Sequence, residues 1–243
     1  MPQAEWLVDG LRELFGDDLA GVYLHGSEVL GGGGPHSDLD AIAVSARRST
    51  PDERLRLLEL CRAVSRHPRA LEFDFVVTSG VRPWSHPAPY DFHFSELQTS
   101  GAGPGTNRDL ASVVTMVLAG NTTLHGQPPA EVFDPVPRAD YHDAILKDAE
   151  TVDEYLPWDT RNVILTLARV WAGVASEPVH SKESAAAWTL ERLPAAHRPV
   201  LERAVAIYRG EEDDRWDDVR LAAAAYAAYL LSEIEKAIST AST

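Results

Sequence analysis

Several features are scarce in this sequence, and each scarcity excludes a class of protein. The 243 residues contain one cysteine, Cys61, so neither an internal disulfide nor a multi-cysteine zinc site can form. The longest apolar run, residues 221–231, falls well short of the roughly 20 residues that cross a bilayer. The first residues contain no basic stretch followed by an apolar segment, so no secretory signal is expected. We therefore expect a cytoplasmic protein without a membrane span.

Basic residues are also scarce relative to acidic ones. The chain has 22 Lys and Arg against 37 Asp and Glu, which gives a formal net charge of −15. Such a charge repels nucleic acid and anionic membranes at long range and attracts cationic ligands. Composition alone favours the simpler interpretation that the acidity keeps the protein soluble.

The pattern of apolar residues predicts a mixed α and β part followed by a purely helical part. Before about residue 136, helices are predicted at 6–15, 51–67 and 107–119 and strands at 20–25, 38–45 and 71–78. Residues 79–105 predict loops and at most one strand. After the proline-marked segment 133–137, helices are predicted at 138–154, 159–175, 182–193, 199–208 and 216–239. The expected fold class is α+β, with domains at 1–136 and 137–243.

Three segments of the first part carry residues suited to phosphate chemistry. Gly26 and Ser27 close the first strand, Asp38 and Asp40 open the second, and Glu72 lies on the third. Residues two apart on a strand share a face, so Asp38 and Asp40 would present both carboxylates on one side of the sheet. Glycine lets a phosphate approach the backbone closely, and serine donates a hydrogen bond to it.

These carboxylates suit magnesium, which takes oxygen ligands from one or two carboxylates and from substrate phosphates. If the strand of Glu72 lies beside that of Asp40, Glu72 adds a third carboxylate, able to hold a metal or to deprotonate an attacking hydroxyl. The pair Asp38 and Asp40 alone is also typical of solvated strand ends. Asp74 shares the face of Glu72 and is interpreted as a polar neighbour. The histidines lack metal-ligand spacing, although His25 and His36 could border the phosphates or simply pack.

In this order the segments resemble the nucleotidyltransferase superfamily, whose members transfer a nucleoside monophosphate to an acceptor. Further segments resemble the aminoglycoside 3''/9-adenylyltransferases, whose fold would be a nucleotidyltransferase domain with a mixed β-sheet followed by an all-α helical bundle. They are Pro83 and Trp84, residues 133–137, 159–167 and 181–183, Trp171, Trp188, residues 192–194 and Tyr208.

The resemblance implies roles for individual residues. It implies that Asp38, Asp40 and Glu72 hold Mg²⁺, that Glu72 is also the catalytic base, that Gly26, Ser27 and Ser37 line the triphosphate, and that Arg169, Lys182 and Tyr208 contact ATP. Two cations beside the departing pyrophosphate would neutralise its charge. The alternative for these last three residues is a solvated helix face.

On the acceptor side the sequence departs from the family pattern. Asp159 matches a family aspartate at the drug site, Asp109 is a weaker acidic candidate, and carboxylates suit a cationic aminocyclitol. Asp159 could instead, or also, cap the helix that follows it. Two residues that the family associates with streptomycin are replaced by Leu97, which offers no flat stacking surface, and by Tyr155, which has no carboxylate. These departures favour spectinomycin over streptomycin as the substrate.

The resulting hypothesis is an Mg²⁺-dependent monomer with an active site between its two domains. It would transfer AMP from ATP to a hydroxyl of an aminoglycoside or aminocyclitol and release pyrophosphate. One alternative is the same chemistry on a metabolite, a protein side chain or an RNA end, and the negative charge argues against RNA. Another is a non-catalytic nucleotide-binding protein, which would need no set of three carboxylates.

Overall fold

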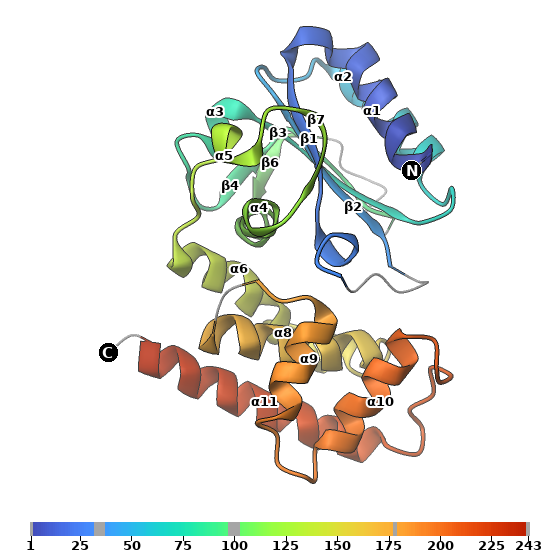
Figure 1. Cartoon of the computed structure of the whole chain (residues 1–243), viewed down its shortest axis with the longest axis vertical. Helices are drawn as coiled ribbons and strands as arrows, with labels where there is room; N and C mark the ends of the chain where they lie inside the picture. Colours follow the sequence, from blue (N-terminus) through green and yellow to red (C-terminus); the bar gives the residue numbers. More distant parts are fainter. Residues whose placement is uncertain (1, 32–36, 97–102, 177–178, 242–243) are drawn as a thin grey trace. The chain divides into compact units, whose positions relative to one another are not determined.

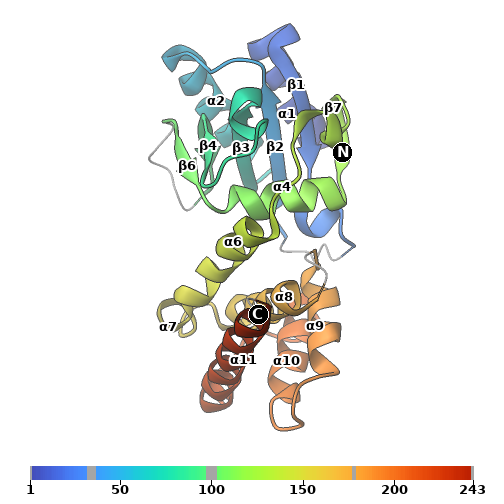
Figure 2. The same cartoon turned by 90° about the vertical axis from the view of Figure 1, so that its left-hand side faces the viewer.

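The computed structural model describes residues 2–31, 37–96, 103–176 and 179–241. The chain divides after Asp140 into two compact units. Figures 1 and 2 show that the first is built around a β-sheet, whereas the described residues of the second form helices and their connections. The α+β class predicted from the apolar pattern is therefore confirmed.

The sheet of the first unit has five strands in the order β5-β3-β2-β1-β7. They are β1 (Leu19–Leu24), β2 (Leu39–Ser45), β3 (Leu71–Val77), β5 (Phe92–Phe94) and β7 (Thr122–Gly126). β2 and β3 are parallel, and the other neighbours are antiparallel, so the sheet is mixed. β4 (Ala88–Tyr90) and β6 (Gly105–Asn107) form a separate two-stranded ribbon.

The parallel pair depends on helix α2 (Pro51–Val64), which connects β2 to β3. Thr50 and Glu53 form a capping box at its start: the Thr50 hydroxyl accepts from the Glu53 amide at 3.2 Å, and the Glu53 carboxylate accepts from the Thr50 amide at 2.7 Å. Pro51 occupies the first turn, where its missing N–H costs nothing. The helix ends three residues before the predicted end at residue 67.

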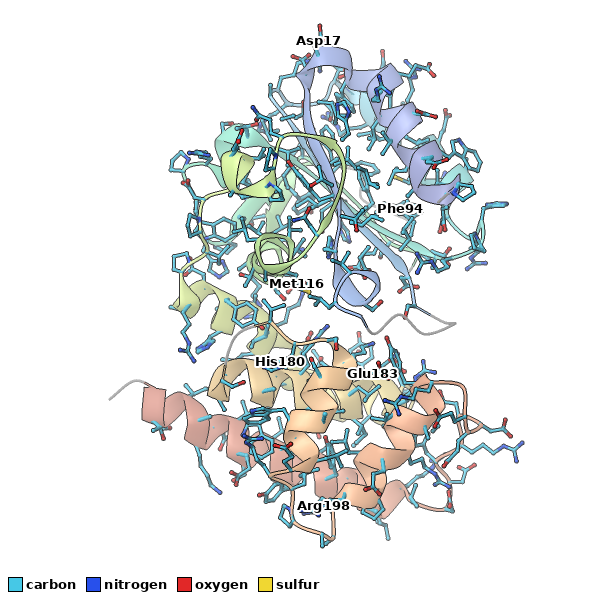
Figure 3. All side chains as sticks on the ribbon, viewed as in Figure 1. Asp17, Phe94, Met116, His180, Glu183 and Arg198 are labelled. Atoms are coloured by element: carbon cyan, nitrogen blue, oxygen red, sulfur yellow. The ribbon has the colours of Figure 1, made fainter. Side chains whose placement is uncertain are left out.

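Each face of the sheet is covered by different helices. Helices α1 (Pro2–Phe15) and α2 lie on one face, and α4 (Leu110–Ala119) lies on the other (Figures 1 and 2). Alternation along β2 sends Ala41 and Ala43 into the core under α1 and α2, where Phe94, labelled in Figure 3, is also buried. Ile42 and Val44 enter the core with α4. Polar residues of β2 and β3 on that second face therefore lie beside a hydrophobic core.

Short elements account for the differences from the sequence-based prediction. Residues 78–107 contain the one-turn helix α3 (Thr78–Val81) and three three-residue strands instead of at most one strand. β7 was not predicted, because the sequence Thr-Thr-Leu-His-Gly has neither an apolar run nor clear alternation. These strands lie at sheet edges or in a ribbon, where one neighbour suffices to satisfy part of the backbone.

The second unit is organised around one buried helix. Its elements are α6 (Arg138–Glu150), which begins in the first unit, α7 (Val152–Tyr155), α8 (Thr160–Ala175), α9 (Lys182–Leu190), α10 (Arg198–Tyr208) and α11 (Arg220–Ala241). α8 packs against α9, α10 and α11. Tyr226 of α11 donates a hydrogen bond to the Ile164 carbonyl at 3.2 Å, and Trp171 of α8 meets Trp188 of α9 edge to face. Among the described helices, none has the length and apolar character to cross a bilayer.

Candidate functional site

The strand register brings two of the predicted carboxylates together. β2 and β3 are parallel, and Asp40 lies opposite Glu72. Both side chains project on the α4 face, because they alternate with Ala41 and Phe73 of the opposite core. Asp38 lies just before β2, and its negative charge acts on Glu72. The structure thus meets the condition under which a third carboxylate was predicted.

A tight turn closes against Asp40. Gly26 begins the short helix η2 (Gly26–Glu28) and has φ of +73°, a left-handed conformation that favours glycine. The amide of His25 donates to the Asp40 carbonyl at 3.1 Å. A Cβ on Gly26 would overlap Asp40 Oδ2 and lie 3.0 Å from its Cγ. Glycine is therefore required both by the backbone and by the Asp40 carboxylate, and Ser27 follows directly in η2.

Glu72 is the one exposed residue of β3, and the acidic groups around it favour its protonated form. Removal of water by surrounding protein atoms is the first cause that raises its pKa, and the negative charge of Asp74 is the second. His93 opposes this shift, while Asp38 and Asp109 add to it. A carboxylate with a raised pKa is a stronger base once ionised, as a general base for a hydroxyl requires.

The sequence did not identify the partner of Asp74. Asp74 is 4% exposed and accepts a hydrogen bond from His93 Nδ1 at 2.9 Å across the β3 and β5 strands. That bond is the first cause that raises the pKa of His93. Asp74 is thus a buried carboxylate hydrogen-bonded to His93 next to Glu72, and the polar position between the buried Phe92 and Phe94 was the available signal.

His25 lies directly after β1, where burial favours its neutral form. It is 6% exposed, and burial lowers its pKa to about 4, against the opposing charge of Asp74. Its Nδ1 has no hydrogen-bond partner among the described residues. Packing is therefore what the structure shows for His25, while His36, the other histidine considered near the phosphates, lies outside the described residues.

Asp109 extends the acidic surroundings of Glu72. It is the N-cap residue of α4, and its amide is held by Asn107 Oδ1 at 3.0 Å. Its charge acts on both Glu72 and His93. The first unit therefore presents a group of carboxylates around Glu72, and a drug-binding role for Asp109 stays a prediction.

In the second unit, three predicted site residues are connected by a network that includes Asn162, a residue not predicted to be in the site. Lys182 begins α9, and its Nζ lies 5.6 Å from the ring centroid of Tyr208 at the end of α10. The same Nζ donates to Asn162 Oδ1 at 3.2 Å, and Asn162 Nδ2 donates to both carboxylate oxygens of Asp159 at 2.9 Å. Asn162 thus connects the acceptor candidate Asp159 with two nucleotide candidates.

The remaining predicted site residues have fewer described contacts with one another. Arg169 lies further along α8 and approaches Asp148 at 3.7 Å. Asp159 is the N-cap residue of α8, but its side chain makes no capping hydrogen bond, so the carboxylate serves Asn162 instead. Ser37 lies just before β2, and Leu97 lies outside the described residues. Tyr155 is half exposed and lines a cavity of about 210 Å³ together with Asp148, Asp159 and Asn162.

No preformed metal cluster accompanies these carboxylates. Among residues 2–31, 37–96, 103–176 and 179–241, no group of three or more His, Cys, Asp or Glu side chains is arranged to hold a metal ion. Magnesium commonly keeps waters and substrate phosphates as ligands, so one or two carboxylates suffice on the protein side. The chemistry of Asp38 and Asp40 fits such a partial shell, which ATP would complete.

Comparisons with known proteins identify the family of the chain. The family model described as the C-terminal domain of aminoglycoside adenylyltransferase matches residues 131–233. The chain is 36% identical over 211 residues to an aminoglycoside (3'')(9) adenylyltransferase of Escherichia coli. The alignment covers 81% of this chain and 80% of the relative. The chain is also 32% identical over 241 residues to a spectinomycin 9-adenylyltransferase of Staphylococcus aureus, with 94% and 93% covered.

A solved structure extends the similarity to the whole fold. It is the spectinomycin adenyltransferase of Enterococcus faecialis, crystallised with ATP and spectinomycin. The TM-score is 0.87 at 25% sequence identity, and the match covers 96% of this chain and 98% of that one. By both sequence and fold, the chain belongs to the aminoglycoside (3'')(9) and spectinomycin 9-adenylyltransferase family.

Proposed function

We propose that this protein transfers AMP from ATP to a hydroxyl group of a cationic aminocyclitol or aminoglycoside. The observation that carries the proposal is the pairing of Asp40 with Glu72, with the Gly26 turn closed against Asp40. This arrangement combines a place for a phosphate, carboxylates for a metal, and a base for the acceptor. The names of the relatives, and the ATP and spectinomycin in the similar structure, support the same reaction.

Glu72 takes the proton of the acceptor hydroxyl as the oxygen attacks the α-phosphorus. A new oxygen–phosphorus bond forms there, the bond from the α-phosphorus to the bridging oxygen breaks, and pyrophosphate leaves with the electron pair. Asp38 and Asp40, and Glu72 as a third ligand, would hold Mg²⁺, which when bound neutralises triphosphate charge and polarises the α-phosphate. Gly26, Ser27 and Ser37 would contact the triphosphate oxygens by backbone amides and hydroxyls.

The nucleotide would also contact the helical domain. Lys182 and Arg169 supply positive charge for the triphosphate and departing pyrophosphate, and Tyr208 supports Lys182 through its ring. We propose domains at residues 1–136 and 137–243 that both contribute to binding one ATP molecule. This assignment requires that substitutions of the proposed nucleotide-binding residues weaken ATP binding in whichever domain they lie.

Spectinomycin is the favoured acceptor. Asp159 and Asp109 supply carboxylates for a cationic drug, whereas Leu97 and Tyr155 replace an aromatic surface and a carboxylate that the family associates with streptomycin. Tyr155 lines the small cavity beside Asp159, so its phenol narrows that cavity without adding charge. A streptomycin guanidinium would therefore find fewer charged partners on this chain.

Purified protein should be incubated with ATP, MgCl₂ and either drug, with pyrophosphate release and drug mass measured together. The expected result is a gain of one AMP on spectinomycin and little or none on streptomycin. Equal modification of both drugs would show that Leu97 and Tyr155 do not discriminate. Modification of neither would favour another small-molecule or protein acceptor, which these same two departures allow.

The role of Glu72 has its own test. Glu72→Gln keeps the size and hydrogen bonding of the side chain but removes the base, so ATP binding should persist and transfer should fall by about 100-fold or more. Glu96→Gln is a matched control, because Glu96 pairs with Arg66 on the same unit and has no proposed role in transfer. Wild-type turnover by Glu72→Gln would eliminate Glu72 as the base.

A further inference from the structure

A second, larger cavity lies within the helical unit. Its volume is about 590 Å³, which falls within the range of roughly 300–1,000 Å³ that holds small-molecule ligands. Residues 156–160, at the start of α8, form one wall. The other wall is formed by residues 214–217 and, on the first turns of α11, by Arg220, Ala223 and Ala224. We call it the Trp158 pocket.

The pocket has one aromatic wall that is free to bind and one that is fixed. Trp158 is 88% exposed, so its ring contributes little to the folded core. Trp216 is 8% exposed, and its indole N–H donates to Asp214 Oδ1 at 2.7 Å. An exposed tryptophan at the edge of a cavity offers a flat apolar surface on which a ring can stack.

The charges of the lining leave a negative excess. Three aspartates within or beside the pocket are each paired with an arginine that neutralises their charge. The pairs are Arg161 with Asp214 at 3.3 Å, Arg220 with Asp217 at 2.7 Å, and Arg215 with Asp213 at 3.0 Å. Asp159 is bonded instead by the neutral amide of Asn162. The charge of Asp159 is therefore not cancelled by that partner, and the pocket favours a cation.

Arg161, which does not itself line the pocket, holds one of the lining carboxylates, Asp214. Arg161 Nε is buried and has no hydrogen-bond partner among the described residues, although Nη1 of the same side chain pairs with Asp214. Buried donors of this kind are rare in folded proteins, and a water or ligand oxygen commonly completes them. What the pocket itself presents from this pair is the Asp214 carboxylate.

Asp159 lines both this pocket and the smaller cavity that also contains Tyr155. One carboxylate therefore borders two spaces on the same helical unit. We propose that the Trp158 pocket is a second subsite for a cationic, polyhydroxylated ring, of the aminocyclitol or aminosugar class, adjacent to Asp159. The ring would stack its apolar face on Trp158, and its ammonium group would approach Asp159. The inference rests on the proposed function only for the class of ligand.

The test measures binding directly, without ATP, by isothermal titration calorimetry with spectinomycin and with streptomycin. Trp158→Ala should weaken binding of at least one drug by about tenfold, the loss of one stacking interaction. Trp158→Phe should keep binding within about threefold of wild type, because it retains an aromatic face. Leu221→Ala removes another exposed apolar side chain of this unit, one outside the pocket lining, and should change nothing.

Kinetics separate this subsite from the active site. Trp158→Ala should raise the drug KM with kcat and the KM for ATP unchanged. Transfer that is wild-type in every variant would overturn the subsite and leave the proposed function intact. Drug binding that depends on Trp158, without pyrophosphate release, would support the subsite and reject the function. Absence of drug binding by the wild-type protein would overturn the subsite.

Discussion

Gly26→Ala should damage the active site far more than the fold. Gly26 has φ of +73°, and an alanine in this left-handed region costs about 1 kcal/mol. The new Cβ would also overlap Asp40 Oδ2, which real Cβ atoms essentially never do, and would lie 3.0 Å from Asp40 Cγ. To restore van der Waals contact the carboxylate must move by about 1 Å. A displacement of that size in a catalytic group costs about 100-fold in rate.

The assay is pyrophosphate release at saturating ATP, with the thermal midpoint measured on the same samples. A loss of about 1 kcal/mol in a domain of this size lowers Tm by roughly 2–4 °C. Gly16→Ala is the matched control: Gly16 also has positive φ, at +51°, but its Cβ would meet no atom within 4 Å. The control should lose similar stability and keep full activity.

Two results would refute this reasoning. If Gly26→Ala keeps wild-type kcat/KM, then either the Asp40 carboxylate adapts without cost or Asp40 does not act in the reaction. If Gly16→Ala and Gly26→Ala lose activity equally, the loss follows from backbone strain and not from the clash with Asp40. Only a selective loss in Gly26→Ala supports the placement of Asp40.

Three further predictions concern single residues. Cys61 is fully buried and burial raises the pKa of its thiol, so a thiol reagent should modify it only at the rate of unfolding, and fast labelling of the folded protein would contradict this. Burial lowers the pKa of His25 to about 4 from an ordinary 6.5, so the unfolded state takes up the proton first and stability falls by at most about 3 kcal/mol as the pH drops from 6.5 to 4. Denaturant unfolding of His25→Gln should show a correspondingly shallower decline, and an equal decline would argue against a neutral buried His25. Asn162→Ala should raise KM for both ATP and drug several-fold, because Asn162 joins Lys182 to Asp159, and unchanged kinetics would show that the network is unnecessary.

The central strands were predictable because a strand buried on both faces has a run of apolar residues that can be recognised locally. Helices cover each side of the sheet, so β1 is apolar on both faces and β2 and β3 are largely apolar except in their first residues, near the site. The end of α2 was missed because it depends on a hydrogen bond between Ser65 and the start of β3. Ser65 turns to extended backbone, and its hydroxyl accepts from the Leu71 amide at 3.0 Å, which directs the chain into β3.

The residues of the site were predictable in part for a related reason. Asp40 and Glu72 stood out because charged residues interrupt apolar strands, but their pairing depends on a register that no local pattern encodes. His93 and Asn162 were missed because their partners, Asp74 and Lys182, lie 19 and 20 residues away in sequence. Contacts of this kind follow from the tertiary fold and produce no periodic pattern in the sequence.

The distribution of charge fits a transferase that must bind one anion and one cation. The charges of Asp74, Asp38 and Asp109 raise the pKa of Glu72, and His93 opposes them. That surface disfavours the triphosphate and favours an ammonium-bearing acceptor. Nucleotide binding therefore needs positive charge from outside this surface, which the proposed divalent cation would supply. On this reasoning the acidity of the chain, −15 overall, belongs to acceptor capture and not only to solubility.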